Sequence, residues 1–184
     1  MEELSSVSID DEKAGETIVD YLIDHGHTKI AEIGANLELS QTAILRHNGY
    51  LNSFKKHGIT PDERYYEKAR FSYDSAYHAM KKLLEKDIEI TAVYAISDVM
   101  AIGAIRAILD KGLRVPEDIS ITGFDGSTLA EYYNPKIVSI RQPHKDMAAH
   151  SVELLFSMID LHKGSCHEII PFELTEGESV ARIN

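Results

Sequence analysis

Three polar side chains stand where short apolar runs of the sequence end. Asp98 comes two residues after the run TAVYAI, Asp125 directly follows ISITGF, and Gln142 closes KIVSIRQ. A carboxylate at the end of a buried strand can serve as a catalytic acid, a metal ligand, a helix cap or a hydrogen-bond acceptor for a bound molecule. Ligands of open α/β sheets bind at the carboxyl ends of the strands. The shared position of the three residues therefore favours a binding site.

Two further residues have chemistry that suits such a site. Arg46 lies inside a helix expected to begin at Ser40. It is either a surface arginine or a guanidinium fork that reaches a polyol or a carboxylate. Phe71 ends a strand expected over 64–71 and is either a core aromatic or an apolar plate for the flat face of a ligand.

Motifs for catalysis, metals and nucleotide cofactors are missing from the sequence. There is no G-x-S-x-G, no G-x-G-x-x-G and no G-x-x-x-x-G-K-[ST]. His144 and His150 are six residues apart, and no Cys or Glu completes a zinc set around them. The single cysteine, Cys166, lies in a polar turn. We therefore expect no enzyme activity, no metal and no cofactor.

Composition narrows the class of protein further. The net charge of the 184 residues is −11, and no cluster of Lys and Arg is longer than a pair, which argues against nucleic-acid binding by these residues. One cysteine fits a reducing compartment. The first residues do not resemble a signal peptide, and no apolar run approaches the roughly 20 residues that span a bilayer. The expectation is a cytoplasmic protein without a membrane segment.

Strands and helices are expected to alternate, and this alternation positions the polar residues. Short apolar runs predict strands over 7–9, 29–34, 64–71, 91–96, 119–124 and 136–142. Amphipathic segments between them predict helices that begin near Asp10, Ser40, Ser72 or Asp74, and Ser97 or Asp98. Such alternation predicts an α/β fold with a parallel sheet flanked by helices. The last third departs from this pattern: a helix of about 18 residues and the strand-like EIIPF either pack on the same sheet or belong to another lobe.

Taken together, several segments resemble the effector-binding region of the lactose/galactose-repressor (LacI/GalR) family. They are YLIDHGHTKIAEIG, RHNGYLNSFKKHGI, TAVYAISDVMAIGAIRAILDKGLRVPEDISITGFD, YYNPKIVSIRQPHKDM and ELTEGESV, in this order, from about residue 7 to 180. The long central block is the most specific. The resemblance implies a two-lobed fold like that of the periplasmic sugar-binding proteins (type I), with the ligand between the lobes.

The resemblance also implies how the chain is divided. Residues 1–6 would be a tail, 7–142 the C-terminal lobe, 143–170 a helix and strand of the N-terminal lobe, and 171–184 a return to the C-terminal lobe. The helix-turn-helix of the family and the first half of the N-terminal lobe are not in this sequence, so DNA contact would belong to a domain outside it. The helix of 143–170 would lack the sheet that normally covers it. We expect it to fold back, to mediate association or to be mobile.

Site residues carry over from the family position by position. Arg46 matches the ligand-binding arginine, Phe71 the aromatic residue that stacks on the effector, and Asp125 the aspartate that accepts hydrogen bonds from sugar hydroxyls. Gln142 matches a polar residue at the lobe crossover. Ser97 stands where many members have asparagine, so it offers a hydroxyl but not the separate donor and acceptor of an amide.

Two more positions and two rival functions complete the prediction. Tyr133 falls in the subunit-interface region of the family, which implies a homodimer, and Gly177 replaces the usual arginine near the C-terminus. The preferred function is the sensing portion of a sugar-responsive repressor. The alternatives are a periplasmic-type sugar-binding transport protein and an α/β enzyme that uses Asp98 or Asp125 as an acid.

Overall fold

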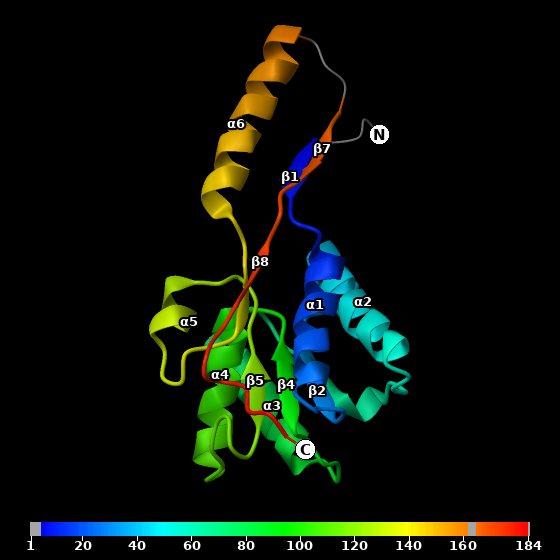
Figure 1. Ribbon diagram of the computed structural model, residues 1–184, viewed down its shortest axis with the longest axis vertical. Coiled ribbons are helices and arrows are strands. Elements are labelled where there is room, and N and C mark those ends of the chain that lie inside the picture. The colour runs from blue at the N-terminus through cyan, green and yellow to red at the C-terminus, as the bar shows by residue number, and fades with distance from the viewer. Residues whose placement is uncertain (1–4, 162–164, 184) are drawn as a thin grey trace.

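The computed structural model describes residues 5–161 and 165–183, which form a body and an arm that stands away from it (Figure 1). The elements of the body are α1 (Asp11–Asp24), β2 (Ile30–Gly34), α2 (Gln41–Lys56), the 3-10 turn η1 (Glu63–Tyr65), β3 (Tyr66–Lys68), α3 (Tyr73–Glu85), β4 (Ala92–Ala95), α4 (Asp98–Asp110), β5 (Ser120–Thr122), α5 (Thr128–Tyr132), β6 (Ser139–Arg141) and β8 (Glu173–Thr175). The arm consists of β1 (Ser6–Ser8), α6 (His144–Leu161) and β7 (His167–Ile169).

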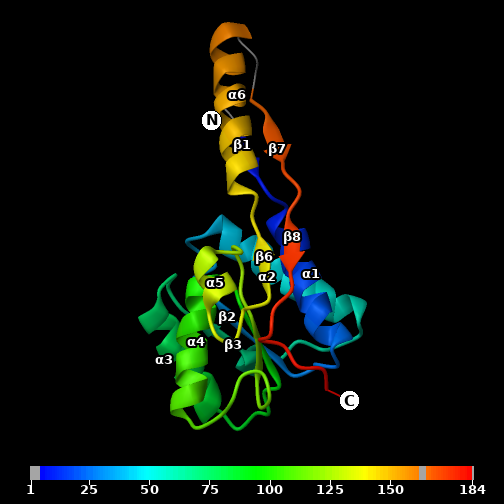
Figure 2. The same ribbon diagram turned by 60° about the vertical axis from the view of Figure 1, so that its left-hand side comes forward.

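A parallel sheet in the order β3-β2-β4-β5 forms the centre of the body. All residues of β2 and β4 are buried, because α1 and α2 pack as a pair on one face of the sheet and α3 and α4 on the other (Figures 1 and 2). This arrangement confirms the predicted α/β fold. Strands covered on both faces need continuous apolar runs, and IAEIG and AVYA come close to that pattern.

Helix caps fix where each helix begins, immediately after a strand or a turn. The side chains of Asp10, Ser40, Ser72 and Ser97 accept hydrogen bonds from backbone N–H groups in the first turns of α1, α2, α3 and α4. Each cap satisfies a donor that has no partner inside the helix. Of the paired candidates in the sequence, Ser72 and Ser97 are therefore the caps.

The strand near Phe71 is shorter than expected. Residues 63–65 form the turn η1, β3 covers only Tyr66–Lys68, and Phe71 follows in a bend. The difference arises because Asp62 accepts a hydrogen bond from the backbone N–H of Arg64 at 2.9 Å, which favours a turn over an extended chain.

The sheet of the body is extended beyond β5 by two later segments. Asp125 and Arg141 form a parallel bridge, so β6 continues the sheet next to the chain after β5. β8 pairs with β6 in the antiparallel direction. The following residues also return to the body, where Ser179 accepts a hydrogen bond from the backbone N–H of Ile121 at 2.8 Å.

The arm is built from segments far apart in the sequence. β1 and β7 pair in parallel, with Val7 opposite Glu168, and α6 lies beside them (Figure 2). Residues 6–8 thus lie beside 167–169 and not in the sheet of the body. The division into lobes at residues 142 and 170, which the resemblance implied, stays a prediction. α6 does not fold back on the body (Figure 1). Within the described ranges, none of the helices has both the length and the apolar character needed to cross a bilayer.

Candidate functional site

The candidate site lies at the carboxyl ends of the parallel strands, on the side of the body that faces the arm (Figure 1). Three chain segments connect this side of the body with the arm: those between β1 and α1, between β6 and α6, and between β7 and β8. The polar residues that follow the strands therefore surround the base of the arm.

Arg46 is at the centre of the site. Its side chain is buried, although it carries a charge that water would solvate. Nε donates to Asp11 Oδ1 at 2.8 Å and Nη1 donates to the carbonyl oxygen of Ile96 at 2.6 Å. Nη1 also lies 3.7 Å from Asp125 Oδ1, and the guanidinium stands 3.6 Å from the centre of the Phe124 ring. These contacts compensate the cost of burying the charge and fix the direction of the fork.

Asp125 lies beside Arg46, and Gln142 is its second partner. Gln142 Nε2 donates to Asp125 Oδ1 at 2.9 Å. The backbone of Asp125 has a φ of 124°, a conformation that favours glycine, and two ladder hydrogen bonds with Ile140 and Gln142 hold it there. Strain held in place by its surroundings is common where a side chain must point in one direction for function.

Burial changes the acidity of Asp125. The loss of solvation raises the pKa of its carboxyl to about 6, and the nearby Asp98 carboxylate adds to the increase. Arg46 and the hydrogen bond from Gln142 act in the opposite direction. The pKa nevertheless lies below neutral pH, so the group is mainly ionised there and can accept hydrogen bonds from a ligand.

Asp98 has a structural place next to the site. It is almost fully buried, and its carboxylate accepts hydrogen bonds from Ser139 Oγ at 2.6 Å and from the backbone N–H of Ser127 at 2.7 Å. Burial raises its pKa, and these hydrogen bonds lower it. Because both oxygens have partners from the segments after β5 and in β6, Asp98 ties these segments together.

Ser97 and Phe71 lie at the same edge of the sheet but outside the direct contacts of Arg46. The Ser97 hydroxyl is buried and accepts the hydrogen bond of the α4 cap, from Met100 N–H at 3.3 Å. Phe71 is 50% exposed, so it is not a core aromatic. The structure thus brings Arg46, Asp125 and Gln142 together and leaves the other two predicted residues at the rim.

The sequence interpretation missed two partners of Arg46. Asp11 is one of the acidic residues in the first turn of α1, and its only visible signal was compatibility with the helix dipole. Phe124 is a buried aromatic that looks like any core residue in the sequence. Both contacts depend on how helices pack on the sheet, which a linear pattern does not specify.

Two glycines set the distance between α1 and α2. A Cβ atom on Gly15 would lie 2.7 Å from the carbonyl oxygen of Arg46, and one on Gly49 would overlap the backbone of Glu12. Without these glycines the helices would separate. The short contact between Arg46 in α2 and Asp11 in α1 therefore depends on them.

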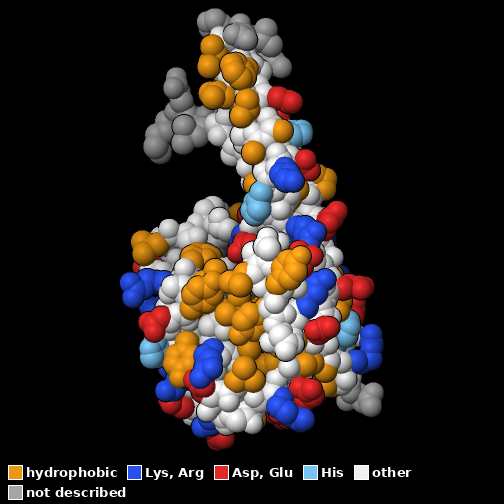
Figure 3. All heavy atoms as spheres, turned by 90° about the vertical axis from the view of Figure 1, so that its left-hand side faces the viewer, with side chains coloured by type: hydrophobic (Ala, Val, Ile, Leu, Met, Phe, Trp, Pro, Cys, Tyr) orange, Lys and Arg blue, Asp and Glu red, His pale blue; other side chains and the backbone are white. Residues whose placement is uncertain are grey.

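The face that includes Tyr133 is a second candidate functional surface. Tyr133 follows α5 and lines an open hollow of about 450 Å³ with Tyr73, Tyr77, Ile102, Gly103 and Arg106, among other residues. Apolar side chains gather over this face of the body (Figure 3). Tyr73 is 46% exposed there.

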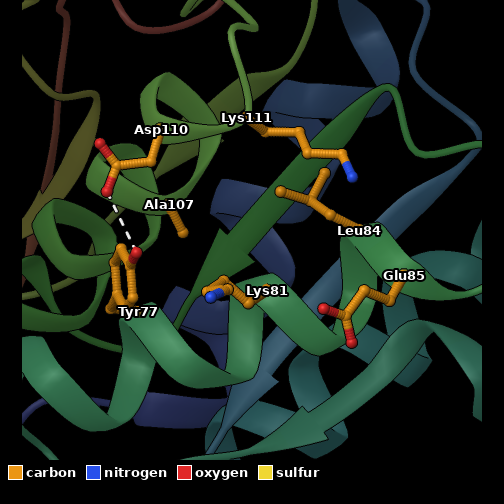
Figure 4. A pocket seen from close by; sticks show the side chains of 7 residues that line it. All are labelled: Tyr77, Lys81, Leu84, Glu85, Ala107, Asp110 and Lys111. Carbon is orange, nitrogen blue, oxygen red and sulfur yellow. Dashed lines mark hydrogen bonds between the residues drawn. The ribbon is translucent and has the colours of Figure 1, made fainter.

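A smaller hollow of about 170 Å³ lies between α3 and α4 (Figure 4). Tyr77 donates to Asp110 Oδ2 at 3.1 Å across it, and Lys81 stands over the Tyr77 ring. Two lysines and two acidic residues line it, so it has no net charge that would select a ligand. In the part of the chain that the structure describes, no three His, Cys, Asp or Glu residues are grouped to hold a metal ion.

The body is a parallel sheet flanked by helices, and Arg46, Asp125 and Gln142 lie at its strand ends, beside the base of the arm. This arrangement is that of a ligand-binding domain of the periplasmic-binding-protein type. Comparison with known families agrees, since the profile of the periplasmic binding protein-like domain matches residues 19–180. The chain belongs to this family, and the proteins that it is similar to are LacI-type transcriptional regulators, in line with the resemblance seen in the sequence.

Similar proteins support this assignment in sequence and in structure. The regulator MalR of Clostridium butyricum is 41% identical over 179 residues, which cover 97% of this chain and 53% of MalR. The repressor PurR of Pasteurella multocida is 40% identical over 140 residues, or 76% of this chain and 42% of PurR. The chain therefore spans about half the length of these curated relatives.

Solved structures give the same result. The regulator CelR in complex with cellobiose has a TM-score of 0.92 and 32% identity, covering 97% of this chain and 54% of CelR. A LacI family regulator from Enterococcus faecium with bound ribose has a TM-score of 0.90 and 26% identity, covering 98% and 67%. The names of these similar proteins are those of transcriptional regulators.

Proposed function

We propose that this chain is the effector-sensing region of a cytoplasmic LacI-type transcriptional repressor, and that its effector is a sugar or a sugar derivative. The observation that carries the proposal is the group of Arg46, Asp125 and Gln142 at the strand ends. It combines a charged donor, a carboxylate and an amide: Gln142 Nε2 donates to Asp125 Oδ1 at 2.9 Å, and Arg46 Nη1 lies 3.7 Å from the same oxygen. Polyols are recognised by such mixed sets of donors and acceptors.

The hydrogen-bonding capacity that remains in this group suits a polyol. Arg46 uses Nε and Nη1 within the protein, and its Nη2 has no hydrogen bond to a described residue. Asp125 Oδ1 is taken by Gln142, which leaves Oδ2 to accept from sugar hydroxyls. In this proposal Phe71 supplies an apolar face at the rim of the effector site. The Ser97 hydroxyl is engaged in the α4 cap, so Ser97 would contact the effector through its backbone.

The arm is, in our proposal, part of the second lobe, and the effector lies between it and the body. Binding would change the orientation of the lobes and thereby the operator affinity of a helix-turn-helix that lies outside these 184 residues. Couplings of this kind are typically about 1–3 kcal/mol. The relatives are about twice as long as this chain, which supports the proposal that the rest of the second lobe lies outside these 184 residues.

A homodimer through the face around Tyr133 belongs to the same proposal. The exposed aromatic side chains there, together with the open hollow, form a surface that a second copy would cover. Isologous contacts of such a surface give a two-fold dimer.

NMR titration of the chain with cellobiose and ribose tests the effector site. Because only part of the second lobe is present, we expect weak binding, with shifts of the Arg46 Nε–H and Gln142 side-chain amide signals. Asp125→Asn should weaken the binding about tenfold or more, since a hydrogen bond to a charged group is lost. Asp118→Asn, at an exposed acid paired with Arg114, is the matched control. Shifts that avoid the strand ends, for every sugar of a panel, would contradict the proposal.

A further inference from the structure

Glu32 is an unexpected residue in the middle of the sheet. It lies in β2, between Ala31 and Ile33, and is buried like every other residue of this strand. Its Oε2 is 2.7 Å from His47 Nδ1, and its Oε1 has no hydrogen-bond partner among the described residues. An apolar side chain would be more stable in this place, because a buried carboxylate loses its hydration. Stability alone therefore does not account for Glu32.

His47 connects Glu32 to a cavity. The residue lies in α2, and its imidazole lines a cavity of about 560 Å³, within the range of small-molecule sites. Because Nδ1 is held by Glu32, Nε2 is the ring nitrogen that remains for another partner, and it has none among the described residues. The other lining residues are Leu37, Tyr50, Leu51, Pro61, Asp62, Glu63 and Tyr66.

The two tyrosines present rings rather than hydroxyls to this cavity. Tyr50 Oη donates to the carbonyl oxygen of Ile30 at 2.9 Å, and Tyr66 Oη donates to that of Ala35 at 2.6 Å. Both rings also pack on His47, Tyr66 edge-on with ring centres 5.2 Å apart and Tyr50 stacked at 6.2 Å. The imidazole is therefore held in a fixed orientation by a carboxylate and two aromatic rings.

The charges near the cavity select against anions. Asp62 and Glu63 are at its border, and Asp62 is paired with Arg64. Glu32 lies behind His47, so the inner end is also next to a carboxylate. A neutral ligand group is favoured over a carboxylate or phosphate in these surroundings.

We propose that this cavity is a second ligand site, separate from the group around Arg46, and that it binds a small neutral molecule with a flat apolar ring and one hydroxyl group. The ring lies among the tyrosines, leucines and Pro61, and the hydroxyl bonds to Nε2 of His47. No residue is shared with the strand-end group, although Arg46 and His47 are neighbours in α2.

The acidity of the pair supports this assignment. Burial raises the pKa of Glu32, and the hydrogen bond to Glu32 raises the pKa of His47. Both shifts keep a proton within the pair, so that Nε2–H can donate to a hydroxyl oxygen. Tyr50 and Tyr66 at the cavity, and Tyr94 opposite Glu32 in β4, have raised pKa values and stay neutral.

Titration of the whole chain with phenol, followed through the His47 ring signals in NMR spectra, tests the proposal. Toluene lacks the hydroxyl and benzoate carries a charge, so they are the matched probes. We expect phenol to shift the signals of His47, Tyr50 and Tyr66, and to bind about tenfold or more tightly than either probe. Toluene binding as tightly as phenol, benzoate binding more tightly, or phenol shifts confined to other residues would each overturn the proposal.

A variant gives an independent measurement. His47→Phe keeps an aromatic ring but removes Nε2, and we expect at least a tenfold loss of phenol affinity with toluene affinity unchanged. Lys55→Ala, on the exposed side of the same helix, is the control and should keep both affinities. Unchanged phenol affinity in a folded His47→Phe protein would refute the hydrogen bond. If this variant does not fold, the wild-type titration with the three probes decides.

Discussion

Asp125 combines a strained backbone with a carboxyl group whose pKa is raised to about 6. Its ordinary value is 3.8, so between these two pH values the folded chain binds more protons at this group than the unfolded chain. The contribution of Asp125 to the free energy of unfolding is therefore highest below pH 3.8, falls as the pH rises to about 6 and stays low above it.

Asp125→Asn should consequently stabilise the protein near neutral pH. Asparagine keeps an acceptor for Gln142 and tolerates positive φ, but it has no charge to desolvate. The expected gain in the free energy of unfolding is on the order of 1–2 kcal/mol near neutral pH, after allowance for solvent screening, and should shrink below about pH 4. Urea unfolding of both proteins at the two pH values measures it. A variant that is less stable near neutral pH would show that the Arg46 contact outweighs desolvation.

The pair of Glu32 and His47 leads to a second prediction at this scale. Replacing both by leucine removes a buried carboxylate and its partner together, which in other proteins is neutral or stabilising by about 1–4 kcal/mol. We expect a higher Tm for the Glu32→Leu, His47→Leu double variant in calorimetry and lower stability for Glu32→Leu alone, which leaves the imidazole without its partner. A large loss of stability in the double variant would assign the pair a structural role instead.

Single residues were predictable from the sequence only where a local pattern places them. Asp125 and Gln142 follow apolar runs, so their position at strand ends was visible, and the structure brings them within 2.9 Å of each other. The partners of Arg46 were not visible, because they come from α1 and from the chain after β4 and β5. Glu32 is a single polar residue in an apolar run, and nothing in the neighbouring sequence indicates its contact with His47.

Among the elements, the contact of α1 with α2 has the most direct effect on the candidate site. Gly49→Ala adds a methyl group where the backbone of Glu12 lies, and should destabilise the protein by about 1–3 kcal/mol by forcing the helices apart. The same shift lengthens the contact between Arg46 and Asp11, so effector binding should weaken as well. Guanidinium unfolding measures the loss.

Lys55→Ala in the same helix serves as the control for this prediction. It lies on the exposed side, and alanine is the best helix former, so its stability should stay within about 0.5 kcal/mol of the wild type. If Gly49→Ala were equally mild, α1 and α2 would have room that the structure does not show.

The order of the elements followed from the sequence, but their pairing in part did not. Alternating apolar runs and caps predicted the parallel α/β sheet, because strands covered on both faces have a distinctive composition. β1 pairs with β7 from the other end of the chain, a contact between three-residue strands whose sequences, SVS and HEI, carry little information. Short strands of this kind are specified by the surrounding structure.

At the scale of the whole molecule, the arm exposes one apolar side. Val152, Leu155, Phe156 and Ile159 of α6 are between 52% and 60% exposed, and their spacing places them on one face of the helix as an apolar strip. Figure 3 shows hydrophobic side chains along the arm. A strip of this kind lowers its free energy by association. We expect the 184-residue chain to associate with increasing concentration.

Leu155→Glu together with Phe156→Glu should reduce this association without unfolding the body, because both side chains are exposed on the arm. Analytical ultracentrifugation over a range of concentrations measures the effect. Glu153→Lys, at an exposed position of the same helix, is the control and should leave association nearly unchanged. An association constant that is the same for the double variant and the wild type would assign the contact to another surface, such as the face around Tyr133.

The return of residues 173–183 to the body sets an order in time for its synthesis. Ser179 is fully buried, accepts from the N–H of Ile121, donates to the carbonyl oxygen of the same residue and accepts from the N–H of Val138. Ile121 and Val138 leave the ribosome about 40 to 60 residues earlier, so their backbone groups wait for a partner while the arm is being made. The body of a nascent chain is thus complete only when this last segment emerges, and a ribosome that stalls within α6 carries a sheet that is still open along one side.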